Sequence, residues 1–234
     1  MTAEQIRARM DAAATPERIA VMKRFFKEPV DPRGISATDQ KQIAKEVFQA
    51  IRKWAASERN ALCTALWRDG KHEDGQMACY VYQRFKKQCG KTEFQLFESW
   101  IDSYVSNWAQ CDALAPTMVA ACVANDPSLL KPLAKWTKSK NRWKRRAAAV
   151  TLIHEAKFGR NLDFVFEIAD LLLDDADEMV QKGVGWLLKE AYPQSPQECM
   201  QFLIPRLDRM PRLMVRYAAE KMSAADRATV MKRD

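Results

Sequence analysis

Trp108 and Asp112 are the first pair of side chains whose types and spacing could do chemistry. They stand four residues apart in the segment 106–112, so on a helix they share one face. A fixed carboxylate stabilises a developing positive charge and can orient a water molecule, and an indole face attracts a cation by about 0.5–2 kcal/mol. The alternative interpretation is a core tryptophan followed by a surface aspartate. The spacing alone leaves both open.

The second candidate is a cluster of cations in residues 136–146. Six of these eleven residues are basic: Lys138, Lys140, Arg142, Lys144, Arg145 and Arg146. Asn141 is placed to cap the helix that follows, and a helix N-terminus with Arg and Lys side chains is a suitable phosphate site. The segment contains no acidic residue. That favours phosphate binding over a merely solvated basic face.

The third candidate is the segment 180–190, which contains Lys182, Gly183, Gly185 and Trp186. Each of the two glycines stands inside a helical pattern and costs about 1 kcal/mol relative to alanine. The close approach of a neighbour or a ligand would offset that cost. The purely structural alternative is tight packing between two helices.

Composition and charge limit what these candidates can be. The chain of 234 residues is 47% hydrophobic and 29% charged, with a net charge of +8. A basic balance points toward nucleic acid or another anionic surface. The N-terminus has no basic and apolar leader, and no apolar run approaches about 18 residues. We therefore expect a cytoplasmic protein, associated with the nucleoid when it is bound to DNA.

Cysteines and histidines offer little for a metal site. None of the six cysteines forms a CxxC pair, and most lie in apolar helical patterns, so we expect buried thiols. The two histidines, His72 and His154, are far apart in the sequence. We therefore expect no zinc site and an active site without histidine.

Helix signals recur along the whole chain. We expect helices to start at Thr2, Thr15, Ser36, Ser57, Thr92, Asp126, Ser195 and Ser223, because these residue types cap N-termini. Gly90 and Gly159 follow periodic runs and are expected to end helices in the left-handed conformation.

The helical pattern predicts an all-α chain. We expect about a dozen helices of about 10–18 residues and no strand, because no segment alternates with a period of two. Helix pairs recur about every 35–40 residues, which is typical of HEAT or armadillo arrays. Such arrays curve and use their inner surface for binding. No linker marks a boundary, so a single domain over residues 1–234 is expected.

Taken together, the three candidate segments resemble the AlkD family of DNA alkylation repair glycosylases. The resemblance begins in the segment 22–26, continues through residues 33–35 and runs to the C-terminal helices. It implies a right-handed α-solenoid of HEAT-like helix pairs with a concave basic groove for duplex DNA. It also implies a monomer that excises N3- and N7-alkylated purines without a metal or organic cofactor and without the usual base flipping.

The resemblance also assigns roles to individual residues. Trp108 and Trp186 match the two tryptophans of the family's active site, Asp112 matches its aspartate and Arg146 its arginine. The remaining cations, Arg145, Arg142, Lys144, Lys140, Lys138 and Lys182, are then expected to contact DNA. Two positions depart from the family pattern, because Val21 replaces a tyrosine and Ala109 replaces an acidic residue.

The implied chemistry suits these residues. An N3- or N7-alkylated purine is already a cation, so its glycosidic bond needs no general acid. Asp112 would stabilise the oxocarbenium ion, the two indoles would favour the cationic lesion, and Arg146 would hold a phosphate. No lysine is an obvious Schiff-base nucleophile, so no lyase step is expected. The alternatives are a non-catalytic binder of DNA structures on the same scaffold and a HEAT-type scaffold that binds another protein.

Overall fold

The computed structural model describes residues 1–68 and 70–232, and in these residues every regular element is a helix. The predicted all-α fold class is therefore confirmed. The chain divides into two compact units, Met1–Leu114 and Ala115–Asp234. The expectation of one domain over residues 1–234 stays a prediction.

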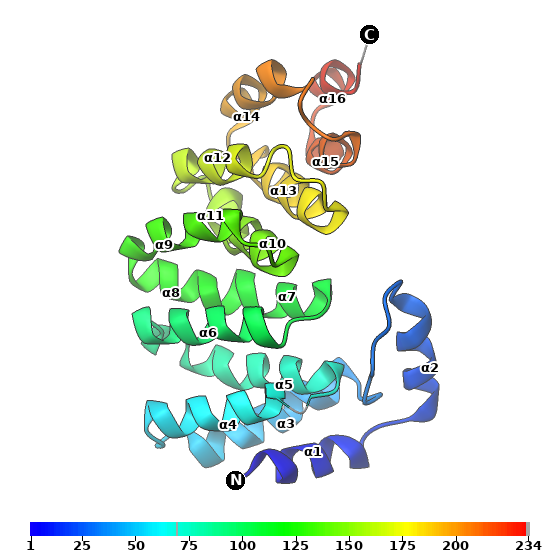
Figure 1. The fold of residues 1–234 in the computed structure, drawn as a ribbon, viewed down its shortest axis with the longest axis vertical. Coiled ribbons are helices and arrows are strands. Elements are labelled where there is room, and N and C mark those ends of the chain that lie inside the picture. Colours follow the sequence, from blue (N-terminus) through cyan, green and yellow to red (C-terminus); the bar gives the residue numbers. More distant parts are fainter. Residues whose placement is uncertain (69, 233–234) are drawn as a thin grey trace. The chain divides into compact units, whose positions relative to one another are not determined.

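Unit 1 is built around α5. Its elements are α1 (Ala3–Ala12), α2 (Pro16–Phe25), α3 (Ala37–Ile51), α4 (Ala56–Arg68), α5 (His72–Tyr82), η1 (Gln83–Gln88), α6 (Lys91–Ser103) and α7 (Trp108–Leu114). The central helix α5 packs against α3, α4 and α7. Figure 1 shows these helices stacked one on the next, with α2 standing beside the stack. Tyr82, Phe97 and Trp100 are buried and contact one another edge-on or tilted within the core.

Unit 2 is built around α13. Its elements are η2 (Ala115–Val119), α8 (Ala120–Asn125), η3 (Pro127–Leu129), α9 (Leu130–Lys135), η4 (Trp136–Lys138), α10 (Arg142–Thr151), α11 (Ile153–Lys157), α12 (Leu162–Leu171), α13 (Glu178–Ala191), α14 (Pro196–Leu203), η5 (Ile204–Arg206), α15 (Arg212–Ala218), η6 (Ala219–Lys221) and α16 (Ala224–Met231). The helices α10, α11 and α15 pack on α13. Because 3-10 and π turns interrupt several helices, many are shorter than expected.

Most of the predicted helix starts are confirmed. The side chains of five residues cap their helices: Thr2, Thr15, Ser36, Asp126 and Ser223. A helix also begins directly after Ser195, although that side chain makes no capping bond. Gly159 has a φ of +64° after α11, in the left-handed region as expected. Local capping chemistry therefore sets most of the boundaries.

The expectations at Ser57, Thr92 and Gly90 are wrong. Ser57 lies inside α4, where the carboxylate of Glu58 caps the backbone N–H of Ala55 instead. Thr92 lies inside α6, and Gly90 precedes that helix in an extended conformation with a φ of −144°. The side chain of Glu93 accepts the N–H of Gly90, so an acid in the first turn starts each of these helices.

All six cysteines are buried thiols, as predicted. Burial raises the pKa of the Cys63 and Cys199 thiols to about 12, so both stay protonated at neutral pH. Among residues 1–68 and 70–232, none of the helices combines the length and the hydropathy needed to cross a membrane.

Candidate functional site

A cavity of about 600 Å³ lies within unit 1. Its walls come from α2, from the segment between α2 and α3, and from α3, α5 and α7. Trp108, Ala109 and Asp112 form the α7 wall. The prediction that Trp108 and Asp112 share one helix face is thus confirmed, and both side chains are half-buried.

The start of α7 is held by a polar network. The side-chain oxygen of Asn107 accepts the N–H of Gln110 at 3.0 Å. The amide nitrogen of Asn107 lies 3.1 Å from Nδ1 of His72. The side chain of Gln110 in turn accepts the N–H of Ser106 and donates to the carbonyl of His72 at 3.4 Å. This network connects the first residue of α5 to the helix that carries Trp108 and Asp112.

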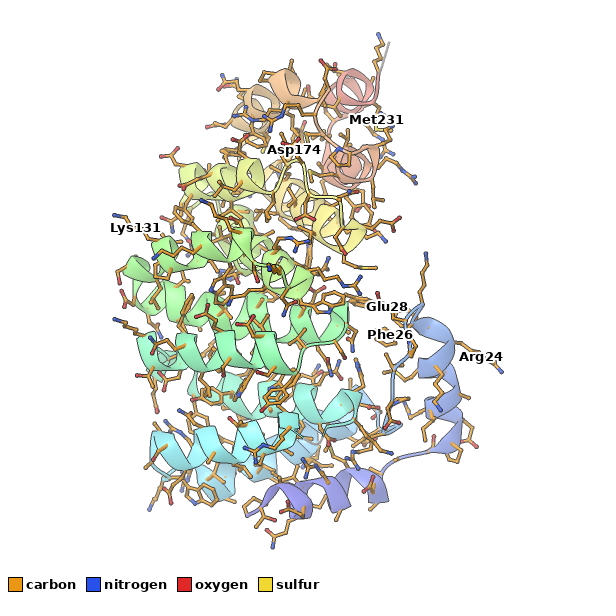
Figure 2. The ribbon with its side chains drawn as sticks, in the orientation of Figure 1. Arg24, Phe26, Glu28, Lys131, Asp174 and Met231 are labelled. Atoms are coloured by element: carbon orange, nitrogen blue, oxygen red, sulfur yellow. The ribbon has the colours of Figure 1, made fainter. Side chains whose placement is uncertain are left out.

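Aromatic rings surround Trp108. The centroids of Phe25 and Phe26 lie 5.8 Å and 5.5 Å from the Trp108 ring, and Phe26 lies 5.0 Å from the imidazole of His72. Phe26 is buried on the side of its segment that faces the rest of the unit, whereas Arg24 lies on the outer side of α2 (Figure 2). The cavity therefore combines aromatic walls with a carboxylate, a combination suited to a flat cation.

The segment that follows α2 is anchored by Glu73. Its carboxylate accepts the backbone N–H groups of Arg33 at 2.7 Å and of Gly34 at 2.8 Å. Gly34 has a φ of +90°, and a Cβ there would lie 2.6 Å from Cγ1 of Ile19. Only glycine allows this close approach of the segment to α2. Glu73 also lines the cavity, so one buried carboxylate both fixes this segment and contributes to the cavity wall.

Asp74, the residue after Glu73, forms a buried ion pair with Arg33. The guanidinium of Arg33 donates to both oxygens of Asp74 at 2.8 Å, and Arg7 adds a contact of 3.1 Å. The Asp74 side chain is 0% exposed and that of Arg33 is 6% exposed. Since buried charges persist only when they are paired, this pair ties α1 and the segment before α3 to α5.

The expectation of an active site without histidine stays a prediction, although His72 lines the candidate cavity. Its side chain is buried, and this burial lowers the pKa of His72. The negative charge of Glu73 acts in the other direction but does not outweigh the burial. Gln40 of α3 lines the same cavity and is 2% exposed. Its side-chain oxygen has no hydrogen-bond partner among the described residues. Sequence spacing gave no signal for either residue, because both reach the site by tertiary packing.

In unit 2, Arg146 and the glycine segment come together. Arg146 is 6% exposed, and its Nη1 donates to the carbonyl of Met179 at 2.5 Å. A Cβ at Gly183 would lie 3.2 Å from Cγ of Arg146. Trp186 is half-buried one turn further along α13, and its indole N–H donates to Glu190 at 3.3 Å. Gly183 therefore provides space for Arg146, a candidate site residue.

Gly185 has a different role. A Cβ there would lie 2.4 Å from Cβ of Tyr217 and 2.8 Å from the carbonyl oxygen of Met214. The second glycine thus permits close packing of α13 on α15, which is the structural alternative considered for this segment.

Acidic residues do approach the cationic segment in the fold. Arg145 donates to both oxygens of Asp175, at 2.6 Å and 3.2 Å, and Arg142 lies 3.4 Å from Asp177. Arg145 also binds the carbonyl of Ser139 at 2.9 Å. The segment itself lacks acidic residues, but acidic side chains from elsewhere in the chain pair with its cations, which corrects the inference of unpaired cations. Arg145 stabilises the turn before α10. Its contact with DNA stays a prediction.

The remaining candidate cations of unit 2 differ in exposure. Lys138 and Lys140 are exposed, whereas Lys144 is half-buried with its Nζ 5.8 Å from the centre of the Trp136 ring. Lys182 forms a 3.7 Å contact with Glu178 on the same helix. The expected cap is confirmed, because the side chain of Asn141 accepts the N–H of Trp143 at 2.9 Å. Lys138 and Lys140 thus lie just before a capped helix start.

No group of three or more His, Cys, Asp or Glu side chains is arranged to hold a metal ion in the part of the chain that the structure describes. The cavity is lined mainly by apolar and aromatic side chains, with two carboxylates, Glu73 and Asp112, and one imidazole, His72, among its other residues.

Fold and site together define a helical-repeat protein with a cation-suited cavity in one unit and a basic, tryptophan-bearing surface in the other. The family model of the DNA alkylation repair enzymes matches residues 6–222. The chain therefore belongs to the DNA alkylation repair enzyme family, and this membership implies DNA as its partner.

Solved structures agree on the fold. A predicted DNA alkylation repair enzyme from Enterococcus faecalis is 18% identical, with a TM-score of 0.81 over 90% of this chain and 97% of that one. AlkD2 from Streptococcus mutans is 15% identical, with a TM-score of 0.64 over 95% of this chain and 100% of that one. The smu.31 protein from Streptococcus mutans is 16% identical, with a TM-score of 0.60 over 88% of this chain and 98% of that one. No curated protein matches the chain.

Proposed function

We propose that this protein is a monofunctional DNA glycosylase that hydrolyses the N-glycosidic bond of cationic N3- or N7-alkylated purines in duplex DNA. The observation that carries the proposal is the placement of Asp112 and Trp108 on one wall of an aromatic cavity. Membership of the DNA alkylation repair enzyme family supports the same assignment.

The reaction requires stabilisation of positive charge more than proton transfer. The alkylated base leaves as a neutral molecule, and charge moves onto the deoxyribose as the bond breaks. The carboxylate of Asp112 stabilises that charge and orients the water that attacks C1′. The rings of Trp108 and Phe26, 5.5 Å apart, add an aromatic surface that favours a cation.

The candidate residues of unit 2 would bind the duplex. Arg146 would hold a phosphate of the duplex, and Trp186 would offer it an indole face. The cations around the capped start of α10 would contact further phosphates, with Lys138 and Lys140 the most exposed of them. These contacts position the DNA and carry no base readout, which suits recognition of the lesion by its charge. We propose that the base is not flipped.

A lyase step is not part of the proposal. No described residue that lines the cavity is a lysine, and a Schiff base at C1′ would need an amine there. Borohydride trapping of a covalent adduct between the protein and DNA would contradict this part.

The experiment that tests the proposal measures release of the base from a duplex containing N7-methylguanine. We expect release by the wild type and a loss of about 100-fold or more in Asp112→Asn, since one transition-state charge contact is removed. DNA affinity, measured by gel shift, should stay unchanged in the variant. Equal release rates in the two proteins would exclude Asp112 from the reaction.

A second function is favoured by one observation. Val21 and Ala109 line the same cavity as Asp112, and they replace the tyrosine and the acidic residue expected from the resemblance to the AlkD family. Loss of both polar groups from one site favours a non-catalytic binder of DNA structures. Binding of DNA without base release by either protein, wild type or Asp112→Asn, would support this second function.

A further inference from the structure

We propose that His72 is a positioning residue whose neutral imidazole fixes the start of α7, and thereby places Trp108 and Asp112 in the cavity. Nothing in the expected mechanism uses this histidine, yet it is 4% exposed and lines the same cavity as both residues. Its functional consequence rests on the proposed function, whereas the contact itself does not.

The geometry fixes the protonation state of His72. Because the side-chain oxygen of Asn107 accepts the N–H of Gln110 at 3.0 Å, its amide nitrogen is the group that points at Nδ1 of His72. An amide nitrogen is only a donor, so Nδ1 must be the acceptor and the ring proton must lie on Nε2. A protonated imidazole would bring an N–H against the amide N–H.

Two further contacts couple His72 to α7. Gln110 donates to the carbonyl of His72 at 3.4 Å, so the backbone of α5 also binds the first turn of α7. The ring of Phe26 contacts both other rings, with its centroid 5.0 Å from that of His72 and 5.5 Å from that of Trp108. Loss of the Nδ1 acceptor would therefore affect both the cap of α7 and the ring contact between Phe26 and Trp108.

Several charged or titratable groups line the cavity with His72: Arg18 on α2, Glu73 and Tyr80 on α5, and Asp112 on α7. Glu73 is engaged by the N–H groups of Arg33 and Gly34. None of these groups replaces the amide of Asn107 as the partner of Nδ1. The contact with Asn107 therefore decides how protonation of His72 acts on α7.

The first test reads the contact directly by NMR. His154→Gln leaves His72 as the one histidine of the sequence. In that protein, ¹⁵N shifts should show an unprotonated Nδ1 and a protonated Nε2 at neutral pH. Asn107→Asp keeps the helix cap but offers Nδ1 an acceptor instead of a donor, so the titration midpoint of His72 should rise. A protonated Nδ1 in the first protein, or an unchanged midpoint in the second, would overturn the proposal.

The second test separates positioning from binding. Gln at position 72 can still accept a hydrogen bond from Asn107, whereas Leu cannot. Single-turnover base release should be about tenfold slower in His72→Leu and close to wild type in His72→Gln, with DNA affinity within about twofold in both. The indole N–H resonance of Trp108 should move in His72→Leu and stay in His72→Gln.

Equal reductions in the release rate of the two His72 variants would overturn the role of the acceptor. If the wild type releases no base at all, the proposed function fails separately, and the ring tautomer together with the Trp108 resonance still decides whether His72 positions α7.

Discussion

Gly183 packs against the side chain of Arg146. A Cβ at this glycine would lie 3.2 Å from Cγ and 3.5 Å from Nη1 of Arg146. The glycine thus provides the space in which a nearly buried guanidinium reaches the carbonyl of Met179. The absence of a side chain at Gly183 on α13 thus makes room for Arg146, which is proposed to bind a phosphate.

Gly183→Ala should weaken DNA binding more than it changes stability. The added methyl group displaces Arg146, while the helix gains about 1 kcal/mol in intrinsic propensity. We expect DNA affinity to fall about three- to tenfold, as for one perturbed phosphate interaction. The free energy of unfolding should change by less than about 1 kcal/mol. Gel shifts and urea denaturation measure the two quantities.

Gly185→Ala is the matched control two residues further along α13. Its Cβ would lie 2.4 Å from Cβ of Tyr217, so we expect a decrease of about 1–3 kcal/mol in unfolding free energy from overpacking. A lower stability in Gly183→Ala than in Gly185→Ala would show that the two glycines have been assigned the wrong roles.

Exposed lysines and ion-paired arginines should differ in their salt dependence. Replacing Lys138 and Lys140 by alanine should lower the slope of log affinity against log salt by about one unit for each phosphate that is no longer neutralised. Stability should be unchanged, since both side chains are exposed. Gel shifts at several salt concentrations provide the slope.

Arg145→Ala, unlike the lysine variants, should lower the stability of the protein. It removes two hydrogen bonds to Asp175 and one each to the carbonyls of Ser139 and Lys140, so we expect a decrease of about 1–3 kcal/mol in unfolding free energy. A normal stability would contradict the structural role of Arg145, and a reduced salt slope would support its predicted contact with DNA.

Asp74→Asn should strongly destabilise unit 1. The variant leaves the buried guanidinium of Arg33 without its buried charged partner, a change that costs about 3–5 kcal/mol. The control is Asp11→Asn, because Asp11 also pairs with Arg33 but its side chain is 59% exposed. That exposed pair is worth about 1 kcal/mol or less. Equal destabilisation of the two variants, measured by denaturation, would contradict the central role of Asp74.

Acid should destabilise the protein through His72. Burial lowers the pKa of His72 below its ordinary value of 6.5. As the pH falls through that value, the unfolded chain binds a proton that the folded chain does not, so the unfolding free energy decreases. We expect a smaller decrease between about pH 7.5 and about pH 5.5 in His72→Gln than in the wild type. Identical decreases would exclude His72 as a source of the acid sensitivity.

Local chemistry explains what could be predicted from the sequence. Capping by Thr15 or Asn141 depends on residues two or three positions away, and the shared face of Trp108 and Asp112 follows from helical periodicity alone. The fold class followed from the repetition of such signals along the chain.

The missed features all depend on contacts between distant segments. His72 and Asn107 are 35 positions apart, and Arg145 and Asp175 are 30 positions apart. No local pattern marks either pair, because the fold alone brings them together. For the same reason, the sequence could not distinguish Gly183, which faces an arginine, from Gly185, which faces a neighbouring helix.

The weak burial of α2 has an evolutionary consequence. This helix has no buried side chain, and its position depends on Gly34 and on the bonds from Glu73 to the backbone that follows it. Val21, Met22 and Phe25 nevertheless line the cavity. Since substitutions outside the core change stability by about 0.5 kcal/mol or less, this wall can vary at little risk to folding. Point substitutions on α2 can therefore change what the cavity accepts while the core and the α7 wall stay constant.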